Sequence, residues 1–100
     1  MCYYRITVDG VGIYEAVERD CPRDDDRRKV KPDGSWLPKV GMNYPGAVSY
    51  WTEAGFERYK TSGLFNWHSS VVRGAVKVDV LERKPASVLY EDELQIIVQQ

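Results

Sequence analysis

The chain opens on a run of aromatic and β-branched residues. Residues 2–8 contain Tyr, Tyr, Ile, Thr and Val and end at Asp9-Gly10, a pattern that predicts a strand followed by a turn. Residues 12–19 then place Ile13 and Val17 four positions apart, which predicts a short amphipathic helix. A helix this short is not stable alone in water, so it requires a sheet to pack on.

A second strand and a longer helical region are predicted near the middle of the chain. Residues 47–51 predict a short strand, and Thr52 is placed to cap a helix that has Glu53 in its first turn. Residues 61–63, Thr-Ser-Gly, can divide the helical region into two helices. Its apolar positions recur at helical intervals: Phe56, Tyr59, Leu64, Trp67 and Val71.

The last quarter of the chain returns to strand patterns. Residues 75–82 alternate, with Val76, Val78 and Val80 on one face, which predicts a half-buried strand. After a turn at Lys84-Pro85, residues 87–90 and 94–98 predict two strands, or one kinked strand. The acidic triplet at 91–93 interrupts them.

A long segment between the first helix and the middle strand shows no periodic pattern. The order of elements favours a small α+β domain: a mostly antiparallel sheet of four to five strands, two to three short helices and one long loop at 20–46. We expect residues 1–100 to form a single domain. Apolar residues in the loop predict that part of it folds back and forms a wall of a cleft: Val30, Trp36, Leu37, Val40, Met42 and Tyr44.

Composition narrows the function classes. The 100 residues are 43% hydrophobic and 29% charged, with a net charge of −1, so no overall field attracts nucleic acid or an anionic membrane. Apolar stretches are too short to span a bilayer, and the N-terminus lacks the pattern of a secretory signal. We therefore expect a cytoplasmic protein in which Cys2 and Cys21 are free thiols.

Local motifs for metal or nucleic-acid binding are weak. His68 is the only histidine and has no metal-ligand spacing, so a packing or surface role is predicted and no metal is expected. The acidic run at 24–26 predicts a solvated loop tip, and it nearly cancels the basic run at 27–29. We therefore do not expect nucleic acid as a partner. A single-stranded nucleic-acid binder that uses Arg27, Arg28, Lys29 and stacked aromatics stays as an alternative.

Three separate segments hold the residues most suited to chemistry. Arg5 lies inside the first strand, Ser49-Tyr50-Trp51-Thr52 ends the middle strand, and Glu91-Asp92-Glu93 precedes the last strand. A structural explanation is also open: Arg5 pairs with a carboxylate on a neighbouring strand, Thr52 caps a helix, and the acidic triplet is the tip of a hairpin.

The order of these three segments resembles the arginine–serine–glutamate class of ADP-ribosyltransferases, in a reduced form. The resemblance implies that Arg5 contacts the phosphate or ribose of NAD, and that Ser49, Tyr50 and Thr52 line the same cofactor site. It implies that Glu93 holds a ribose hydroxyl and stabilises the cationic sugar as nicotinamide leaves, while Glu91 positions the acceptor. A fixed carboxylate beside such a cation is chemically reasonable.

The sequence thus leaves functions of different classes open. The first is a small intracellular domain that is not catalytic and acts through protein–protein contacts or self-association. The alternative is an NAD-binding enzyme that resembles ADP-ribosyltransferases and cleaves the nicotinamide–ribose bond. The single-stranded nucleic-acid binder is the second alternative.

Overall fold

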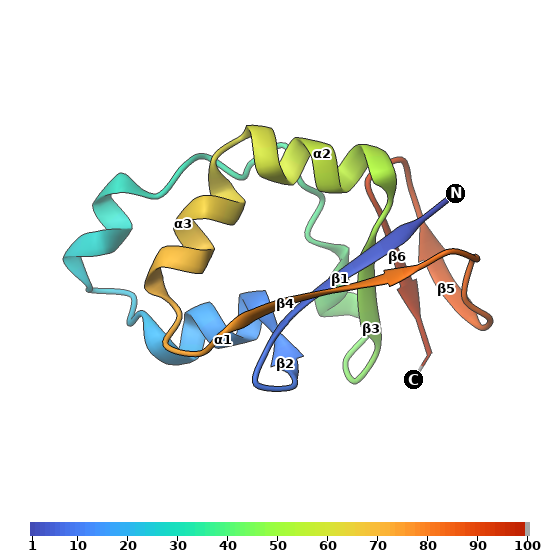
Figure 1. Cartoon of the computed structure of the whole chain (residues 1–100), viewed down its shortest axis with the longest axis horizontal. Coiled ribbons are helices and arrows are strands. Elements are labelled where there is room, and N and C mark those ends of the chain that lie inside the picture. Colours follow the sequence, from blue (N-terminus) through green and yellow to red (C-terminus); the bar gives the residue numbers. More distant parts are fainter. Residues whose placement is uncertain (100) are drawn as a thin grey trace.

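One curled antiparallel sheet carries three helices in the computed structural model, which describes residues 1–99 (Figure 1). The α+β class predicted from the sequence is confirmed. The helices are α1 (Ile13–Asp20), α2 (Glu53–Thr61) and α3 (Leu64–Val71). The strands are β1 (Tyr3–Val8), β2 (Val11–Gly12), β3 (Val48–Trp51), β4 (Val76–Leu81), β5 (Val88–Glu91) and β6 (Gln95–Val98).

Strand β1 is the centre of the sheet. Along one edge it pairs with β4 over six residues, from Tyr3 opposite Leu81 to Val8 opposite Val76. Its other edge meets β2 in a tight hairpin and β3 where Tyr4 lies opposite Trp51. The sheet continues from β3 through β6 to β5, and every pairing is antiparallel. Among the described residues, β4 and β5 are therefore the two long edge strands.

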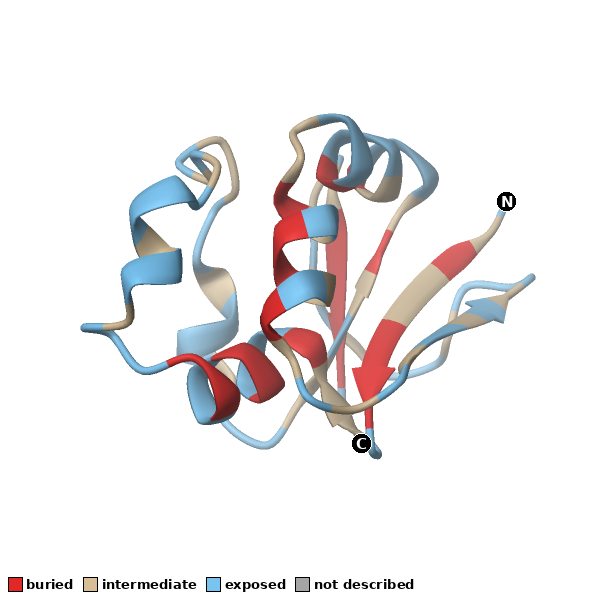
Figure 2. Cartoon of the chain, turned by 60° about the vertical axis from the view of Figure 1, so that its left-hand side comes forward, coloured by how far each residue is buried: buried red, intermediate tan, exposed pale blue. Residues whose placement is uncertain are grey.

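The main hydrophobic core lies between the sheet and the helices. Alternation along β1 turns Ile6 and Val8 towards the helices, and Trp51 of β3 lies on the same face. Figure 2 shows buried residues along the sides of α1 and α3 that face the body of the molecule. The helical side of the core is formed by Ile13, Ala16, Val17, Cys21, Tyr59, Leu64, Trp67 and Val71.

A second, smaller core lies on the opposite face of the sheet. Tyr3, Ile96 and Val98 are buried there, although no helix within residues 1–99 contributes to this cluster. The curl of the sheet brings β1 and β4 over β5 and β6, so the strands enclose the cluster themselves. The surrounding residues are Val48, Tyr50, Leu81 and Val88.

Part of the long loop folds back on the sheet, as predicted: Trp36 and Leu37 pack against the main core, whereas Val30 and Met42 are exposed. The rings of Trp36 and Trp51 lie 6.1 Å apart, and Gln95 Nε2 donates a hydrogen bond of 2.8 Å to the Pro38 carbonyl oxygen. Two short 3₁₀ helices that the sequence pattern did not predict, η1 (Asp26–Val30) and η2 (Val40–Asn43), lie within it. The loop therefore covers part of the sheet that the helices do not reach.

Strand β4 differs from expectation in what covers its valine face. The alternation predicts a half-buried strand, yet Val78 is 39% and Val80 is 50% exposed. The helices pack over β1, β2 and β3 and leave this face of β4 largely open.

Within the described residues, no helix is long and apolar enough to cross a membrane.

Candidate functional site

The alternation of side chains divides the predicted site between two faces of the sheet. Arg5 is half-buried, lies opposite Asp79 of β4, and shares its face with Tyr3 and Tyr50. Ser49 lies on the opposite face of β3, in register with Ile97. The strand geometry therefore does not bring Arg5 and Ser49 together.

Thr52 connects the start of α2 to the β5–β6 hairpin. Its Oγ1 accepts a hydrogen bond of 3.0 Å from the Gly55 N–H and donates one of 2.6 Å to the Glu93 carbonyl oxygen. Its own N–H donates to the Leu94 carbonyl oxygen at 3.0 Å. Thr52 is thus the predicted helix cap, and it also holds the hairpin turn against the helix.

The acidic triplet ends β5 with Glu91 and begins the hairpin turn with Asp92 and Glu93. One Asp92 carboxylate oxygen accepts hydrogen bonds from the backbone N–H groups of Leu94 and Gln95, and the other accepts one from the Tyr90 hydroxyl. Burial by itself would raise the pKa of Asp92, but these hydrogen bonds outweigh it and hold the pKa below the usual value. Glu91 forms an ion pair with Lys84, and Glu93 is exposed.

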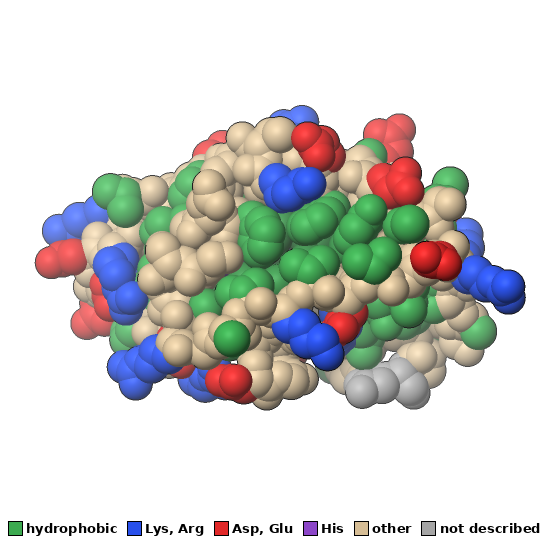
Figure 3. Space-filling view, in the orientation of Figure 1, with side chains coloured by type: hydrophobic (Ala, Val, Ile, Leu, Met, Phe, Trp, Pro, Cys, Tyr) green, Lys and Arg blue, Asp and Glu red, His purple; other side chains and the backbone are tan. Residues whose placement is uncertain are grey.

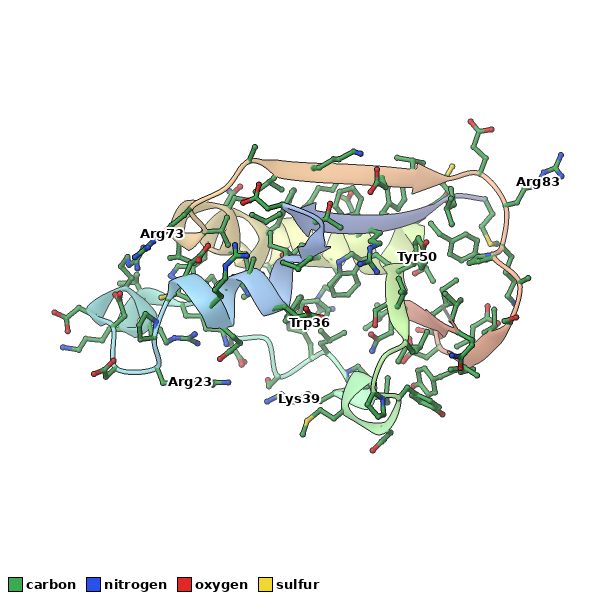
Figure 4. The ribbon with its side chains drawn as sticks, turned by 90° about the horizontal axis from the view of Figure 1, so that it is seen from below. Arg23, Trp36, Lys39, Tyr50, Arg73 and Arg83 are labelled. Atoms are coloured by element: carbon green, nitrogen blue, oxygen red, sulfur yellow. The ribbon has the colours of Figure 1, made fainter. Side chains whose placement is uncertain are left out.

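A shallow depression of about 310 Å³ lies beside this turn. Trp36 and Pro38 of the long loop form part of its lining, and Tyr90, Asp92, Glu93 and Leu94 of the hairpin form the rest. Figure 4 shows Trp36 on the loop, with Tyr50 on β3. Of the six residues predicted for the site, Glu93 alone lines this depression, together with the loop tryptophan that the sequence placed in a cleft wall.

A larger open depression, of about 530 Å³, follows strand β4. It is lined by residues 80–85, which follow β4 into the next turn. None of the six predicted residues lies in it.

His68 is a packing residue, as predicted. It is 2% exposed, and its Nδ1 shares a hydrogen bond of 2.6 Å with the hydroxyl of Tyr59. Burial, assisted by the positive charges of Lys31 and Arg28, lowers the pKa of His68 to about 4. Burial also raises the pKa of Tyr59, so the pair is neutral at physiological pH.

The basic cluster of the loop is occupied by contacts within the chain. Arg27 forms an ion pair of 2.9 Å with Asp25, and Arg28 donates to the carbonyl oxygens of Cys21 and Pro22 at the end of α1. Trp67 Nε1 donates to the Arg27 carbonyl oxygen at 3.0 Å. These contacts hold η1 against the helices. No group of three potential metal ligands occurs within residues 1–99.

An apolar surface beside α2 and β4 was not anticipated from the sequence. The Tyr4 and Phe56 rings stack with centroids 4.5 Å apart, and Phe65 lies 5.9 Å from Phe56. Tyr4 is opposite Val80 in the β1–β4 pairing, so the rings adjoin the open valine face. Figure 3 shows hydrophobic side chains gathered between α2 and β4. We name this surface the β4 apolar face; it comprises Tyr4, Phe56, Phe65, Val76, Val78 and Val80.

The signal for this face was present but ambiguous. Alternating valines predict that one side of β4 is apolar, but they do not show whether another element covers it.

Comparison with models of protein families, with curated proteins and with solved structures finds no match to this chain.

Proposed function

We propose that this protein is a non-catalytic interaction module that contacts another protein chain through the β4 apolar face. The observation that carries the proposal is the exposure of Val78 (39%) and Val80 (50%) beside three aromatic rings. A contiguous exposed apolar patch is a common mark of an interaction surface. Covering it removes apolar area from water, which favours association.

The distribution of polar residues also favours a binding role. Arg5 and Ser49 belong to opposite faces of the sheet, and Thr52 and Asp92 are used in the hairpin and helix cap. Arg27 and Arg28, which a nucleic-acid binder would need for phosphates, are engaged by Asp25 and by backbone carbonyl groups. Val78 and Val80 of the apolar face, in contrast, are exposed.

The test is site-specific photocrosslinking in living cells that produce the full chain. A photoreactive phenylalanine analogue at position 80 should give a covalent adduct to a protein, and the same analogue at position 89 should not. Leu89 is the matched control because it is 41% exposed on β5, outside the β4 apolar face. Absence of any adduct at position 80 would refute the proposal.

A second candidate function rests on the depression beside the hairpin. Glu93 and the Trp36 ring both line it. Of the predicted ADP-ribosyltransferase-like site, Glu93 is the residue that lies in this depression. NAD would then be the cofactor and cleavage of its nicotinamide–ribose bond the reaction. Millimolar NAD should raise the melting temperature by mass action, and Glu93→Gln should abolish nicotinamide release while retaining most binding. No shift in melting temperature would remove this candidate.

A further inference from the structure

Strand β4 exposes its outer backbone edge. In the part of the chain that the structure describes, it pairs with β1 alone. Figure 4 shows β4 at the border of the molecule, with β1 directly inside it. Alternate residues of an edge strand direct unpaired N–H and C=O groups outwards, which is the surface that another strand can extend.

The open edge and the β4 apolar face point to the same side of the molecule. In Figure 4, β4 lies along the upper border of the molecule, which is the side that faces the viewer in Figure 3. Apolar side chains gather on that side in Figure 3. A strand that pairs with β4 would therefore continue the valine face as well as bond to its backbone. One occupant can satisfy both features.

Charges on the other face of β4 restrict which strand fits. Lys77 and Asp79 alternate with the valines. Lys77 Nζ lies 3.4 Å from Asp79 Oδ1 in an ion pair. In an antiparallel pairing of β4 with itself, two-fold symmetry places one residue opposite its own copy. This symmetry keeps the valine faces of the two copies on the same side of the joined sheet. For a pairing near the middle of the strand, the residue on the axis is then Lys77, Val78 or Asp79.

Only one of these three registers is favourable. Centring on Lys77 or Asp79 places two like charges directly opposite each other, which is destabilising. Centring on Val78 places Lys77 opposite the second copy's Asp79, and Asp79 opposite its Lys77. The same register places Val76 opposite the second copy's Val80, so every apolar position meets an apolar position. The sequence of β4 is thus complementary to itself.

We propose that β4 pairs antiparallel with β4 of a second copy of this chain, with Val78 on the two-fold axis. This proposal rests on the proposed function and specifies its partner. The sheets of the two copies become continuous, and the two β4 apolar faces adjoin across the axis. The register also brings Arg73 near the second copy's Arg83, but both side chains are exposed and lie beyond the strand ends (Figure 4).

The first test measures self-association of the full chain by sedimentation equilibrium. The wild-type chain should form a dimer, and Val78→Lys should weaken dimerisation at least about tenfold, since it places two ammonium groups at the axis. Leu89→Lys is the matched control, because Leu89 is 41% and Val78 39% exposed. The control variant should dimerise as the wild type does.

The second test examines the register. Lys77→Glu places two carboxylates opposite each other, and Asp79→Lys places two ammonium groups opposite each other, so each variant should dimerise weakly alone. An equimolar mixture of the two restores opposite charges at both positions. Native mass spectrometry should then show a mixed dimer in preference to either homodimer. Circular dichroism verifies that each variant is folded. If either charge variant fails to fold, the Val78→Lys measurement decides whether β4 pairs with β4.

The outcomes separate this proposal from the function it rests on. A wild-type chain that stays monomeric at millimolar concentration, or a dimer unaffected by Val78→Lys, would overturn pairing through β4. If position 80 nevertheless crosslinks to a different protein in cells, the interaction module stands and its partner is not a second copy. If position 80 gives no adduct and the chain is monomeric, both proposals fail.

Discussion

Buried polar side chains in this protein are satisfied by specific partners, and His68 is the clearest case. It lies on α3, where Tyr14 of α1 meets it edge-on with ring centroids 4.7 Å apart and Tyr59 of α2 shares its hydrogen bond. Asp20 is similarly buried and accepts hydrogen bonds from Arg19 and the Arg73 N–H, which lower its pKa to about 2. Residue types of this kind suggest chemistry in a sequence, but here their partners stabilise the fold.

Stability should depend on pH through His68. Its pKa is about 4 in the folded chain and about 6.5 when unfolded, so the unfolded state binds more protons between these values. The free energy of unfolding should therefore fall by up to about 3 kcal/mol as pH drops from 6.5 to 4.

Urea denaturation across this pH range measures the effect. His68→Gln should flatten the dependence by about one proton. Tyr59→Phe is the control, because it removes the hydrogen bond but leaves the imidazole buried, so the slope should persist. An equally steep slope in His68→Gln would contradict the assignment.

Removal of the Thr52 hydroxyl should destabilise the fold without altering its overall shape. Thr52→Ala loses the cap to Gly55 N–H and the bond to the Glu93 carbonyl oxygen. We expect a loss of about 1–2 kcal/mol in thermal or urea denaturation. Thr52→Ser retains the hydroxyl and should recover most of that loss; an alanine variant as stable as the wild type would contradict this role.

At the scale of elements, close contacts between distant segments determine the arrangement. Helix α2 approaches the β5–β6 hairpin so closely that a Cβ on Gly55 would lie 1.8 Å from the Leu94 carbonyl oxygen. Gly74, before β4, approaches the Asp9 side chain in the same way, with a Cβ placed 2.3 Å from its Oδ2. A glycine within a helix pattern therefore indicates packing here, which the pattern alone does not show.

Gly55→Ala should force α2 away from the hairpin. The added methyl group meets backbone atoms, which cannot rotate aside, so we expect a loss of about 1–3 kcal/mol despite the better helix propensity of alanine. Glu57→Ala, on the exposed side of α2, should change stability by about 0.5 kcal/mol or less. A stabilised Gly55→Ala chain would show that the contact is not tight.

At the scale of the whole molecule, two cores share one sheet. Strand β1 contributes Ile6 and Val8 to the helical core and Tyr3 to the smaller one, and β3 joins β1 to β6. Loss of either core exposes strands that the other core needs. The two clusters should therefore unfold together.

Ile96→Ala tests this coupling. Ile96 is fully buried in the smaller core, so we expect a loss of about 2–5 kcal/mol. Tryptophan fluorescence, which reports mainly on the helical core, and far-ultraviolet circular dichroism should show one coincident transition. The exposed Val78→Ala is the control and should change stability far less. An earlier, separate transition in Ile96→Ala would mean that β5 and β6 unfold independently.

Much of the fold could be predicted from local pattern. The first strand, the helix that follows it, the capped helix at Thr52 and the division of the helical region near Gly63 all follow from periodicity and turn residues. The two-residue strand β2 and the two 3₁₀ helices could not be predicted, because elements this short have no measurable period. Asp92 and Glu93 of the acidic triplet proved to lie in the turn of a hairpin, a structural role that the sequence had left open beside a catalytic one.

What the sequence by itself determined is which residues form strands and helices, because that depends on spacings of two or of three to four residues along the chain. Tertiary structure alone decided which face of each strand is covered. Arg5 and Ser49 are separated by the pairing of β1 and β3. Val78 and Val80 of β4 are open because the helices within residues 1–99 pack mainly on β1, β2 and β3. Such facts depend on contacts between residues far apart in the sequence, which no local pattern specifies.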